Sequence, residues 1–277
     1  MEILMVIGII LLIILLIGYL YFENTNLKVT NYIVKSSNIP KEFNNYKIVQ
    51  ISDYHNEENR ELNTKLVSEI KSSNPDAIFI TGDLIYSRGV NIYIAISLIK
   101  KIKNIAPIYF VIGNHETSVA AYKDLEKELI NEGVNILKNQ KIVIEKNNSK
   151  MNILGINDPK LDNISEKNNK KTVNKAIHSI KYDKSLYTIL LSHRPEIFDI
   201  YVKNNINLVL AGHAHGGQIR FFKQGLIAPG QGLFPKYTSG VYEKKNTKMV
   251  VSRGIGKSIF PFRVNNRPEV VVVTLKK

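Results

Sequence analysis

The chain has 277 residues, of which 44% are hydrophobic and none is cysteine, so disulfides and thiolate metal sites are excluded. This length suits one large α/β domain behind a separate N-terminal segment. The formal net charge of +14 is compatible with an anionic partner. No basic run is interleaved with aromatic residues, so we do not expect nucleic acid and favour an anionic bilayer or a phosphate substrate.

Residues 3–22 form an uninterrupted apolar segment without a charged side chain. A run of this length is sufficient for one helical bilayer crossing. The segment lacks the basic start and short apolar core of a cleaved signal peptide, so we predict a retained transmembrane anchor over residues 1–22. A linker over 23–44 and a folded domain over 45–277 follow. Lysines follow the anchor but do not precede it, which favours a cytoplasmic location for the domain.

Apolar runs of strand length alternate with helical segments through the first half of the domain. One additional strand, 28–34, is expected within the linker. The expected strands of the domain are 46–52, 77–81 and 107–112, and the expected helices are 58–72, 92–103 and 122–131. A repeated β-α-β pattern of this kind predicts an α/β fold with a largely parallel sheet and right-handed crossovers.

The second half of the domain continues with a mixture of strands and helices. Two neighbouring strands, 142–145 and 151–156, are followed by an Asn- and Lys-rich segment, 158–171, that we expect to be a surface loop. The remaining expected elements are a helix at 173–181, a strand at 186–191, a helix begun by Pro195 and strands at 208–210, 218–222, 248–252 and 269–275. No internal repeat or second domain is indicated.

The strand at 208–210 ends abruptly in the sequence Gly-His-Ala-His-Gly-Gly. In an extended backbone residues i and i+2 point the same way, so we expect His213 and His215 to face one point in space. Neutral imidazoles arranged in this way suit metal binding. The alternative interpretation is two surface histidines in a loop.

Other polar residues also follow strand-like runs. They are His55 in Asp53-Tyr54-His55, Asp83 in Gly82-Asp83, His115 in Gly113-Asn114-His115-Glu116, and His193. Only His178 falls in a polar, helical segment, where we expect a solvated surface residue. Because open α/β sheets bind ligands at the carboxyl ends of their strands, these repeated His, Asp and Asn residues predict a site at that edge.

This ordered set of motifs resembles the calcineurin-like metallophosphoesterase superfamily. The resemblance covers about residues 45–275 and implies a four-layer α/β sandwich. Downstream motifs are similar to the bacterial membrane-anchored phosphodiesterase branch, which includes UDP-2,3-diacylglucosamine pyrophosphatases. These motifs are Gly212–Arg220, Ser239-Gly240-Val241-Tyr242, Arg253-Gly254-Ile255-Gly256 and Arg263–Glu269.

The resemblance also implies roles for individual residues around two divalent metal ions. The first metal would be held by Asp53, His55 and His215, and the second by Asn114, His193 and His213, with Asp83 as the bridge. Oxygen and imidazole ligands without thiolate suit Mn, Fe or Zn. His115, beside Asn114, matches the general acid that protonates the leaving oxygen. The competing interpretation is a set of structural polar residues at strand ends.

The function implied is a membrane-anchored phosphoesterase that hydrolyses a phosphodiester or pyrophosphate bond by attack of a metal-bridging hydroxide. The substrate would be a phosphoester, including lipid- or nucleotide-linked ones such as UDP-2,3-diacylglucosamine. A phosphomonoesterase and a non-catalytic binding scaffold on the same fold remain as alternatives.

Arg194 and Arg253 are candidates for substrate binding, because guanidinium groups pair well with phosphate. An ordinary surface role for both arginines is the alternative. Five phenylalanines in the Gly-rich C-terminal region fit either core packing, which we favour, or an apolar lip for an acyl chain. They are Phe221, Phe222, Phe234, Phe260 and Phe262.

Overall fold

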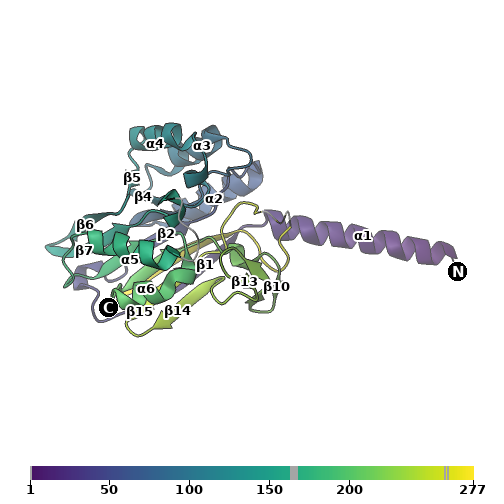
Figure 1. The fold of residues 1–277 in the computed structure, drawn as a ribbon. Coiled ribbons are helices and arrows are strands. Elements are labelled where there is room, and N and C mark those ends of the chain that lie inside the picture. The colour runs from purple at the N-terminus through teal and green to yellow at the C-terminus, as the bar shows by residue number, and fades with distance from the viewer. Residues whose placement is uncertain (1, 163–167, 259, 261) are drawn as a thin grey trace.

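A computed structural model describes residues 2–162, 168–258, 260 and 262–277, and it begins with a helix that projects away from the body (Figure 1). This helix, α1 (Glu2–Thr25), has a mean hydropathy of 3.2 in its most apolar window, none of which is buried. A rise of about 1.5 Å per residue makes it roughly 36 Å long, more than a hydrocarbon core of about 30 Å requires. In the described chain it is the one helix long and apolar enough to cross a membrane.

The body contains two six-stranded sheets. The first has the order β1 (Lys28–Lys35), β16 (Glu269–Lys276), β2 (Lys47–Ile51), β3 (Ala77–Thr81), β4 (Ile108–Val111) and β5 (Asn135–Ile136). Its outer face is covered by α2 (Arg60–Ser73), α3 (Ile92–Ile102) and α4 (Tyr122–Asn131). The strands β2 to β5 are parallel, and β16 runs antiparallel to β2.

The second sheet has the order β14 (Gly240–Lys244), β15 (Thr247–Val251), β9 (Leu208–Ala211), β8 (Thr188–Leu191), β7 (Ser149–Gly155) and β6 (Gln140–Lys146). Its four central strands are parallel, and both edge strands are antiparallel. The helices α5 (Asn169–Ser179) and α6 (Phe198–Lys203) cover its outer face. Two short hairpins, β10 (Arg220–Phe221) with β11 (Gln224–Gly225) and β12 (Ile227–Ala228) with β13 (Gly232–Leu233), follow β9.

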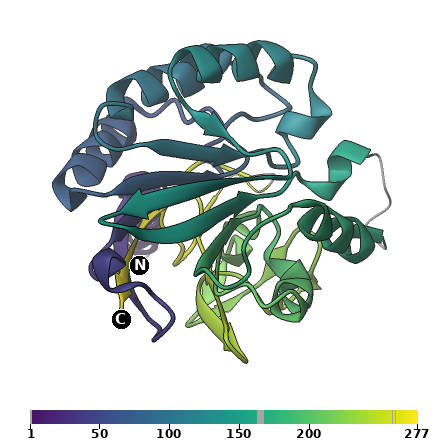
Figure 2. The same cartoon turned by 90° about the vertical axis from the view of Figure 1, so that its left-hand side faces the viewer.

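The two sheets pack face to face, with helices on both outer sides (Figure 2). The reason is visible in β3, which is buried along its whole length. Its side chains alternate between faces: Ile78 and Ile80 pack toward the helices, whereas Phe79 joins the core between the sheets. The arrangement is therefore helix, sheet, sheet, helix, and the expected four-layer α/β fold is confirmed.

The strand expected within the linker is confirmed as β1, which pairs with β16 over its full length, from Lys28 opposite Glu269 to Lys35 opposite Lys276. Most strand pairs in the two six-stranded sheets are parallel, as expected, and the antiparallel pairs are β16 with β2, β14 with β15 and β6 with β7. One sequence-based expectation needs revision. The segment 158–171 is not wholly a surface loop, because Asp158 is buried and α5 begins at Asn169; residues 163–167 of that segment lie outside the described residues.

Candidate metal centre

The predicted site residues meet where the carboxyl ends of five strands, from both sheets, come together. Asp53 and His55 follow β2, Asp83 follows β3, Asn114 and His115 follow β4, His193 follows β8, and His213 and His215 follow β9. Buried Gln50 joins the sheets at this edge, because its Nε2 donates to Thr81 Oγ1 at 3.0 Å and to the Ala211 carbonyl at 2.9 Å. The fold thus brings together residues that are far apart in sequence.

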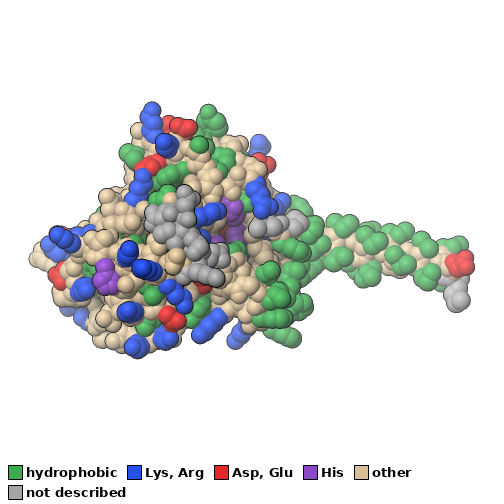
Figure 3. Space-filling model, viewed as in Figure 1, with side chains coloured by type: hydrophobic (Ala, Val, Ile, Leu, Met, Phe, Trp, Pro, Cys, Tyr) green, Lys and Arg blue, Asp and Glu red, His purple; other side chains and the backbone are tan. Residues whose placement is uncertain are grey.

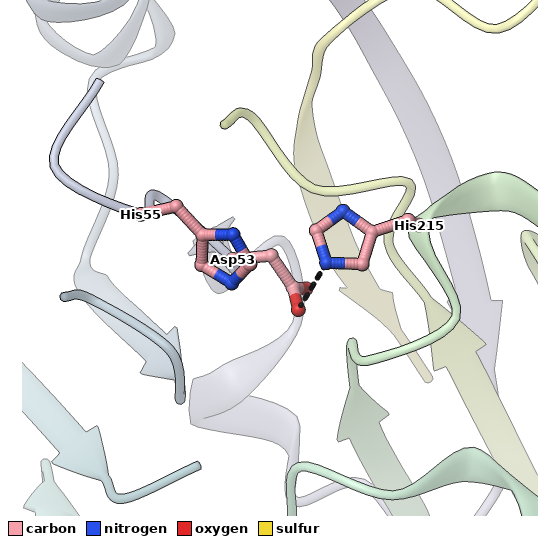
Figure 4. A group of neighbouring side chains, drawn as sticks. All are labelled: Asp53, His55 and His215. Carbon is pink, nitrogen blue, oxygen red and sulfur yellow. Dashed lines mark ion pairs between the residues drawn. The ribbon is translucent and has the colours of Figure 1, made fainter. Parts of the chain in front are cut away.

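Asp53, His55 and His215 form the first cluster (Figure 4). Their potential ligand atoms all lie within 4.8 Å of one another, and His215 Nε2 is 3.4 Å from Asp53 Oδ1. His55 Nε2 turns toward Asp83, 3.3 Å from its Oδ2. All three residues of the cluster are buried.

His193 is the centre of the second cluster. Its Nε2 lies 3.1 Å from Asp83 Oδ2, 3.1 Å from His213 Nδ1 and 3.1 Å from Asn114 Oδ1. The same oxygen of Asp83 therefore faces His55 in one direction and His193 in the other. A single carboxylate oxygen is thus shared between the two clusters.

These separations match what a bound divalent cation would require. Ligand atoms about 2.1 Å from one ion lie roughly 3.0–3.4 Å from each other in octahedral or tetrahedral geometry. His193 Nδ1 donates to the Thr81 carbonyl at 2.8 Å, which leaves Nε2 free to bind a cation. His55 Nδ1 lies 2.5 Å from the Lys257 carbonyl and is held in the same way. The donor set therefore fits a pair of divalent ions.

The backbone that presents these residues is unusual. Asp53, His55, Asp83, His213 and His215 all have positive φ, a conformation that costs a non-glycine residue about 1–3 kcal/mol. His213 and His215, with φ of 65° and 45°, are therefore not in an extended strand, and the expectation that they face one point is wrong. The chain turns between them, so His213 joins His193 while His215 joins Asp53.

Glu116 is a structural member of the site that the sequence analysis missed. Its Oε2 accepts hydrogen bonds from the backbone N–H of Asp83 and of Gly113, both at 2.8 Å, and its Oε1 accepts from Ile85 N–H at 3.0 Å. The buried carboxylate thereby holds the turn that carries Asp83 against the turn after β4. Its place directly after Asn114-His115 was the available signal.

Close backbone packing also depends on glycine. Gly82 has φ of +91°, and a Cβ there would lie 2.6 Å from His193 Nδ1. A Cβ on Gly212 would lie 1.8 Å from Ser52 Oγ. Neither position can accept a side chain without displacing a neighbouring residue of the site.

The surroundings of Asp83 favour its ionised, negatively charged form among neighbouring imidazoles. Burial opposes ionisation of Asp83, but His193 and His55 outweigh it and hold the pKa of that carboxyl well below its usual range. Burial lowers the pKa of His213 and of His215 well below the ordinary value, so both are neutral. Burial also opposes the charge on His193, yet Asp83 and Asp53 raise its pKa to about 10. A divalent cation would have to displace that proton.

His115 lies at the edge of the clusters and is partly open to solvent. Its Nε2 is 3.8 Å from Asp83 Oδ2, and its Nδ1 accepts from Ser87 N–H at 3.1 Å. This hydrogen bond places the proton of the neutral ring on Nε2, the nitrogen that faces the site. Burial lowers the pKa of His115 to about 4, and Asp83 opposes that shift only in part. The Tyr86 ring packs 4.9 Å from His115 and 5.1 Å from His55.

The two candidate arginines have different surroundings. Arg194 is buried, and its guanidinium donates to both oxygens of Asp158, at 2.7 and 3.1 Å. Arg253 is partly exposed, and its Nε is 3.8 Å from Glu269 Oε1, too long for a hydrogen bond. Arg253 thus keeps donors available, whereas those of Arg194 are already used. His178 is exposed on α5, as expected.

An α/β sandwich with clustered aspartates and histidines at its strand ends defines a metal-dependent hydrolase. The profile of calcineurin-like phosphoesterases matches residues 46–217, and the chain belongs to this family. It is accordingly a phosphoester hydrolase, of a family that uses two divalent metals.

Several relatives are similar over most of this chain. The uncharacterized metallophosphoesterase YkuE of Bacillus subtilis (strain 168) is 31% identical over 266 residues, which are 92% of this chain and 88% of YkuE. A zebrafish (Danio rerio) transmembrane protein with a metallophosphoesterase domain is 26% identical over 90% of this chain and 57% of its own length. Among solved structures, TT1561 of Thermus thermophilus superposes with a TM-score of 0.50 at 12% identity, over 76% of this chain and 90% of TT1561, which indicates a shared fold.

Proposed function

We propose that this protein is a membrane-anchored phosphodiesterase or pyrophosphatase with two metal sites. Asp53, His55 and His215 would hold one ion. Asn114, His193 and His213 would hold the other, and Asp83 would bridge them. The observation that carries this proposal is the position of Asp83 Oδ2, 3.3 Å from His55 Nε2 and 3.1 Å from His193 Nε2. Mn, Fe and Zn all suit these oxygen and imidazole donors.

Two divalent ions held by these residues would supply Lewis-acid chemistry to the phosphate and would activate the attacking water. The chain itself contributes the proton for the leaving oxygen, which we assign to His115 Nε2. In the free protein the pKa of His115 is about 4, so its ring is neutral at pH 7. A phosphate anion bound beside Nε2 raises that pKa, because the negative charge stabilises imidazolium. In that imidazolium Nδ1 also carries a proton, which the Ser87 hydroxyl, 2.7 Å from Nδ1, can accept and so keep the ring oriented.

The substrate we favour is a phosphodiester or pyrophosphate attached to a lipid or a nucleotide, of the type of UDP-2,3-diacylglucosamine. The support is the exposed apolar helix α1 beside a phosphoesterase domain. Arg253, whose side chain is partly exposed, is the arginine that we retain for phosphate binding. We further propose that α1 is a single membrane span and that the domain lies on the cytoplasmic side, where the lysines that follow α1 favour it.

The decisive test is an assay of the full-length protein in lipid nanodiscs with added Mn. The substrates would be bis-(p-nitrophenyl) phosphate, p-nitrophenyl phosphate and a UDP-linked glycolipid. We expect the diester or the pyrophosphate to be hydrolysed faster than the monoester. Faster turnover of the monoester would instead identify a phosphomonoesterase.

The matched control is Asp83→Asn, which removes the bridging charge with little change in shape. We expect it to lose metal and activity together, because a neutral amide cannot replace a charge shared by two ions. Wild-type protein that holds its metals but turns over none of the substrates would indicate a binding scaffold and contradict the proposal.

A further inference from the structure

We propose that an apolar surface at the base of α1 lies in the interface of a lipid bilayer. The surface consists of Phe221 and Phe222 at the tip of the β10–β11 hairpin, and of Leu233 and Phe234 at the open end of the β12–β13 hairpin, where Phe234 N–H donates to the Leu226 carbonyl at 2.8 Å. We call it the hairpin surface. The inference rests on the proposed membrane anchor and adds a second point of contact between the protein and the lipid. It also corrects our expectation that these phenylalanines pack in the core.

These side chains are strongly exposed. Phe222 is fully exposed, and Phe221, Leu233 and Phe234 are each more than 60% exposed. Phe222 and Phe234 also have positive φ, at 53° and 50°, which is an outlying conformation for a bulky residue. A clustered apolar patch of this kind on a folded protein marks a contact surface rather than incidental exposure.

The position of the hairpin surface relative to α1 is fixed by a chain of hydrogen bonds. Tyr19 in α1 donates to Asn265 Oδ1 at 3.0 Å, and Asn265 Nδ2 donates to the Arg220 carbonyl at 3.2 Å. Arg220 N–H in turn donates to the Val264 carbonyl at 3.0 Å. Because Phe221 directly follows Arg220, the β10–β11 hairpin is held beside the last turns of α1, and Figure 1 shows both hairpins on the side of the body from which α1 leaves.

The thickness of a bilayer, compared with the length of α1, also supports contact between the hairpin surface and lipid. A hydrocarbon core of about 30 Å takes up roughly 20 helical residues, so a span that begins at Ile3 ends near Phe22. Tyr19 and its partner Asn265 then lie at the interface, together with the adjacent hairpin. In Figure 3, hydrophobic side chains are gathered on the edge of the body that faces along α1. Exposed Lys223 follows Phe222 at the hairpin tip, and Arg267 lies 5.4 Å from the Phe22 ring, as suits cations near lipid headgroups.

The same segment ties the metal centre to this interface. Asn266 N–H donates to Glu23 Oε2 at 2.7 Å, at the end of α1. Its side-chain amide donates to the carbonyls of His215 and Gln218, at 2.8 and 3.0 Å. A second membrane contact would therefore fix the orientation of the turn that carries His215 relative to the lipid surface.

The experiment uses single tryptophan residues, because the chain contains none. Full-length Phe222→Trp, Leu12→Trp and Tyr93→Trp variants would be placed in nanodiscs of phosphatidylcholine and phosphatidylglycerol with brominated acyl chains. Leu12 lies in the middle of α1 and reports on the proposed anchor. Tyr93 is 81% exposed on α3 and is the matched control for an aromatic residue away from the hairpin surface.

We expect bromine to quench Leu12→Trp and Phe222→Trp, the latter best with bromine near the headgroups, and to leave Tyr93→Trp unquenched. If Leu12→Trp is quenched but Phe222→Trp is not, the anchor stands and the hairpin inference is overturned. Blue-shifted emission from Phe222→Trp without quenching would reveal contact with a second protein copy and would also overturn it. If Leu12→Trp is not quenched, the anchor itself fails, together with the inference that rests on it.

Discussion

At the scale of single residues, the site depends on which atom of each polar side chain faces the clusters. Asp83 Oδ2 faces the imidazoles, while its Oδ1 accepts from the backbone N–H of His115 at 2.8 Å. The two oxygens of one carboxylate thus have separate contacts, one with the imidazoles of the two clusters and one with the turn that carries the proposed acid. Substitutions at neighbouring positions should therefore have distinct effects.

His115→Ala should leave both metals bound and slow turnover, because His115 is proposed to give a proton and not to hold an ion. Loss of acid catalysis is worth about 10²–10⁴-fold in rate. The loss should shrink for a diester with a nitrophenolate leaving group, which needs little protonation. Turnover of two diesters with different leaving groups, together with metal analysis, tests this, with His178→Ala as control. Equal slowing on both substrates, or loss of metal, would contradict the assignment.

Glu116→Gln should destabilise the fold around the site, because it disrupts the hydrogen bonds that hold the turn carrying Asp83. The side-chain amide would place an NH₂ group against backbone N–H donors that now share the carboxylate. A buried donor left without an acceptor costs about 1–3 kcal/mol, so the free energy of unfolding should fall by that order. Urea denaturation of this variant and of Glu58→Gln, at an exposed position, provides the measurement. Equal stability of the two variants would show that Glu116 has no clamping role.

At the scale of elements, α1 has an apolar, projecting part and a C-terminal part that contacts the folded body. Its last turns are fastened to the segment before β16: Arg263 N–H donates to Asn24 Oδ1 at 2.9 Å, and Asn266 N–H donates to Glu23 Oε2. Residues 2–19 of α1, by contrast, are exposed along their length. The exposed part of the helix thus gives way to the part in contact with the body near Tyr19.

Truncation should separate these two parts of α1. Deleting residues 2–18 should remove the transmembrane anchor, leave the hairpin surface as the one remaining proposed lipid contact, and preserve hydrolysis of a soluble diester, because the contacts of Tyr19, Glu23 and Asn24 remain. Deleting residues 2–26 should also lower stability and activity, because Asn266 N–H would lose its acceptor, the buried carboxylate of Glu23. Membrane fractionation, thermal unfolding and diester assays would distinguish the two. Identical thermal stability of both truncations would show that the end of α1 does not support the body.

At the scale of the whole molecule, the two sheets are held together at the edge where they share the metal centre. His193 from the second sheet donates to the Thr81 carbonyl of the first, and His213 N–H donates to Asp53. Metal binding would therefore join the two halves of the sandwich as well as enable catalysis. Metal content and global stability should be linked.

Removal of the metals should abolish activity and leave a characteristic pH dependence of stability. The pKa of His193 is about 10 in the fold, against 6.5 for an unperturbed histidine. A raised histidine pKa stabilises the fold fully below pH 6.5, and that contribution is lost as pH rises toward 10. Metal-free protein should therefore become less stable across this window.

With Mn bound the trend should reverse, because the ion needs the deprotonated imidazole and binds more tightly as pH rises. Urea unfolding over the same pH range, with chelator and with Mn, is the measurement. Full activity after exhaustive chelation would contradict the metal mechanism. A stability difference between the two forms that does not grow with pH would contradict the linkage through His193.

The sequence by itself determined the local features of this protein. The uncharged run 3–22 lies wholly within α1 (Glu2–Thr25), and it could be predicted because its length and apolarity are local properties of the sequence. The strand Ala77–Thr81 and the helix Tyr122–Asn131 match the expected bounds. Both depend on local patterns: β3 is a continuous apolar run, and the apolar residues of α4 recur with helical periodicity. The placement of His, Asp and Asn after strands followed from the same patterns.

Only the tertiary structure decided which distant segments meet. The pairing of β1 with β16, more than two hundred residues apart, depends on hydrogen bonds that no local pattern encodes. The left-handed turns that send His213 and His215 to different clusters are maintained by surrounding contacts. The ion pair between Arg194 and Asp158 and the exposure of Phe222 likewise depend on how distant elements pack, which the residues next to them in sequence do not determine.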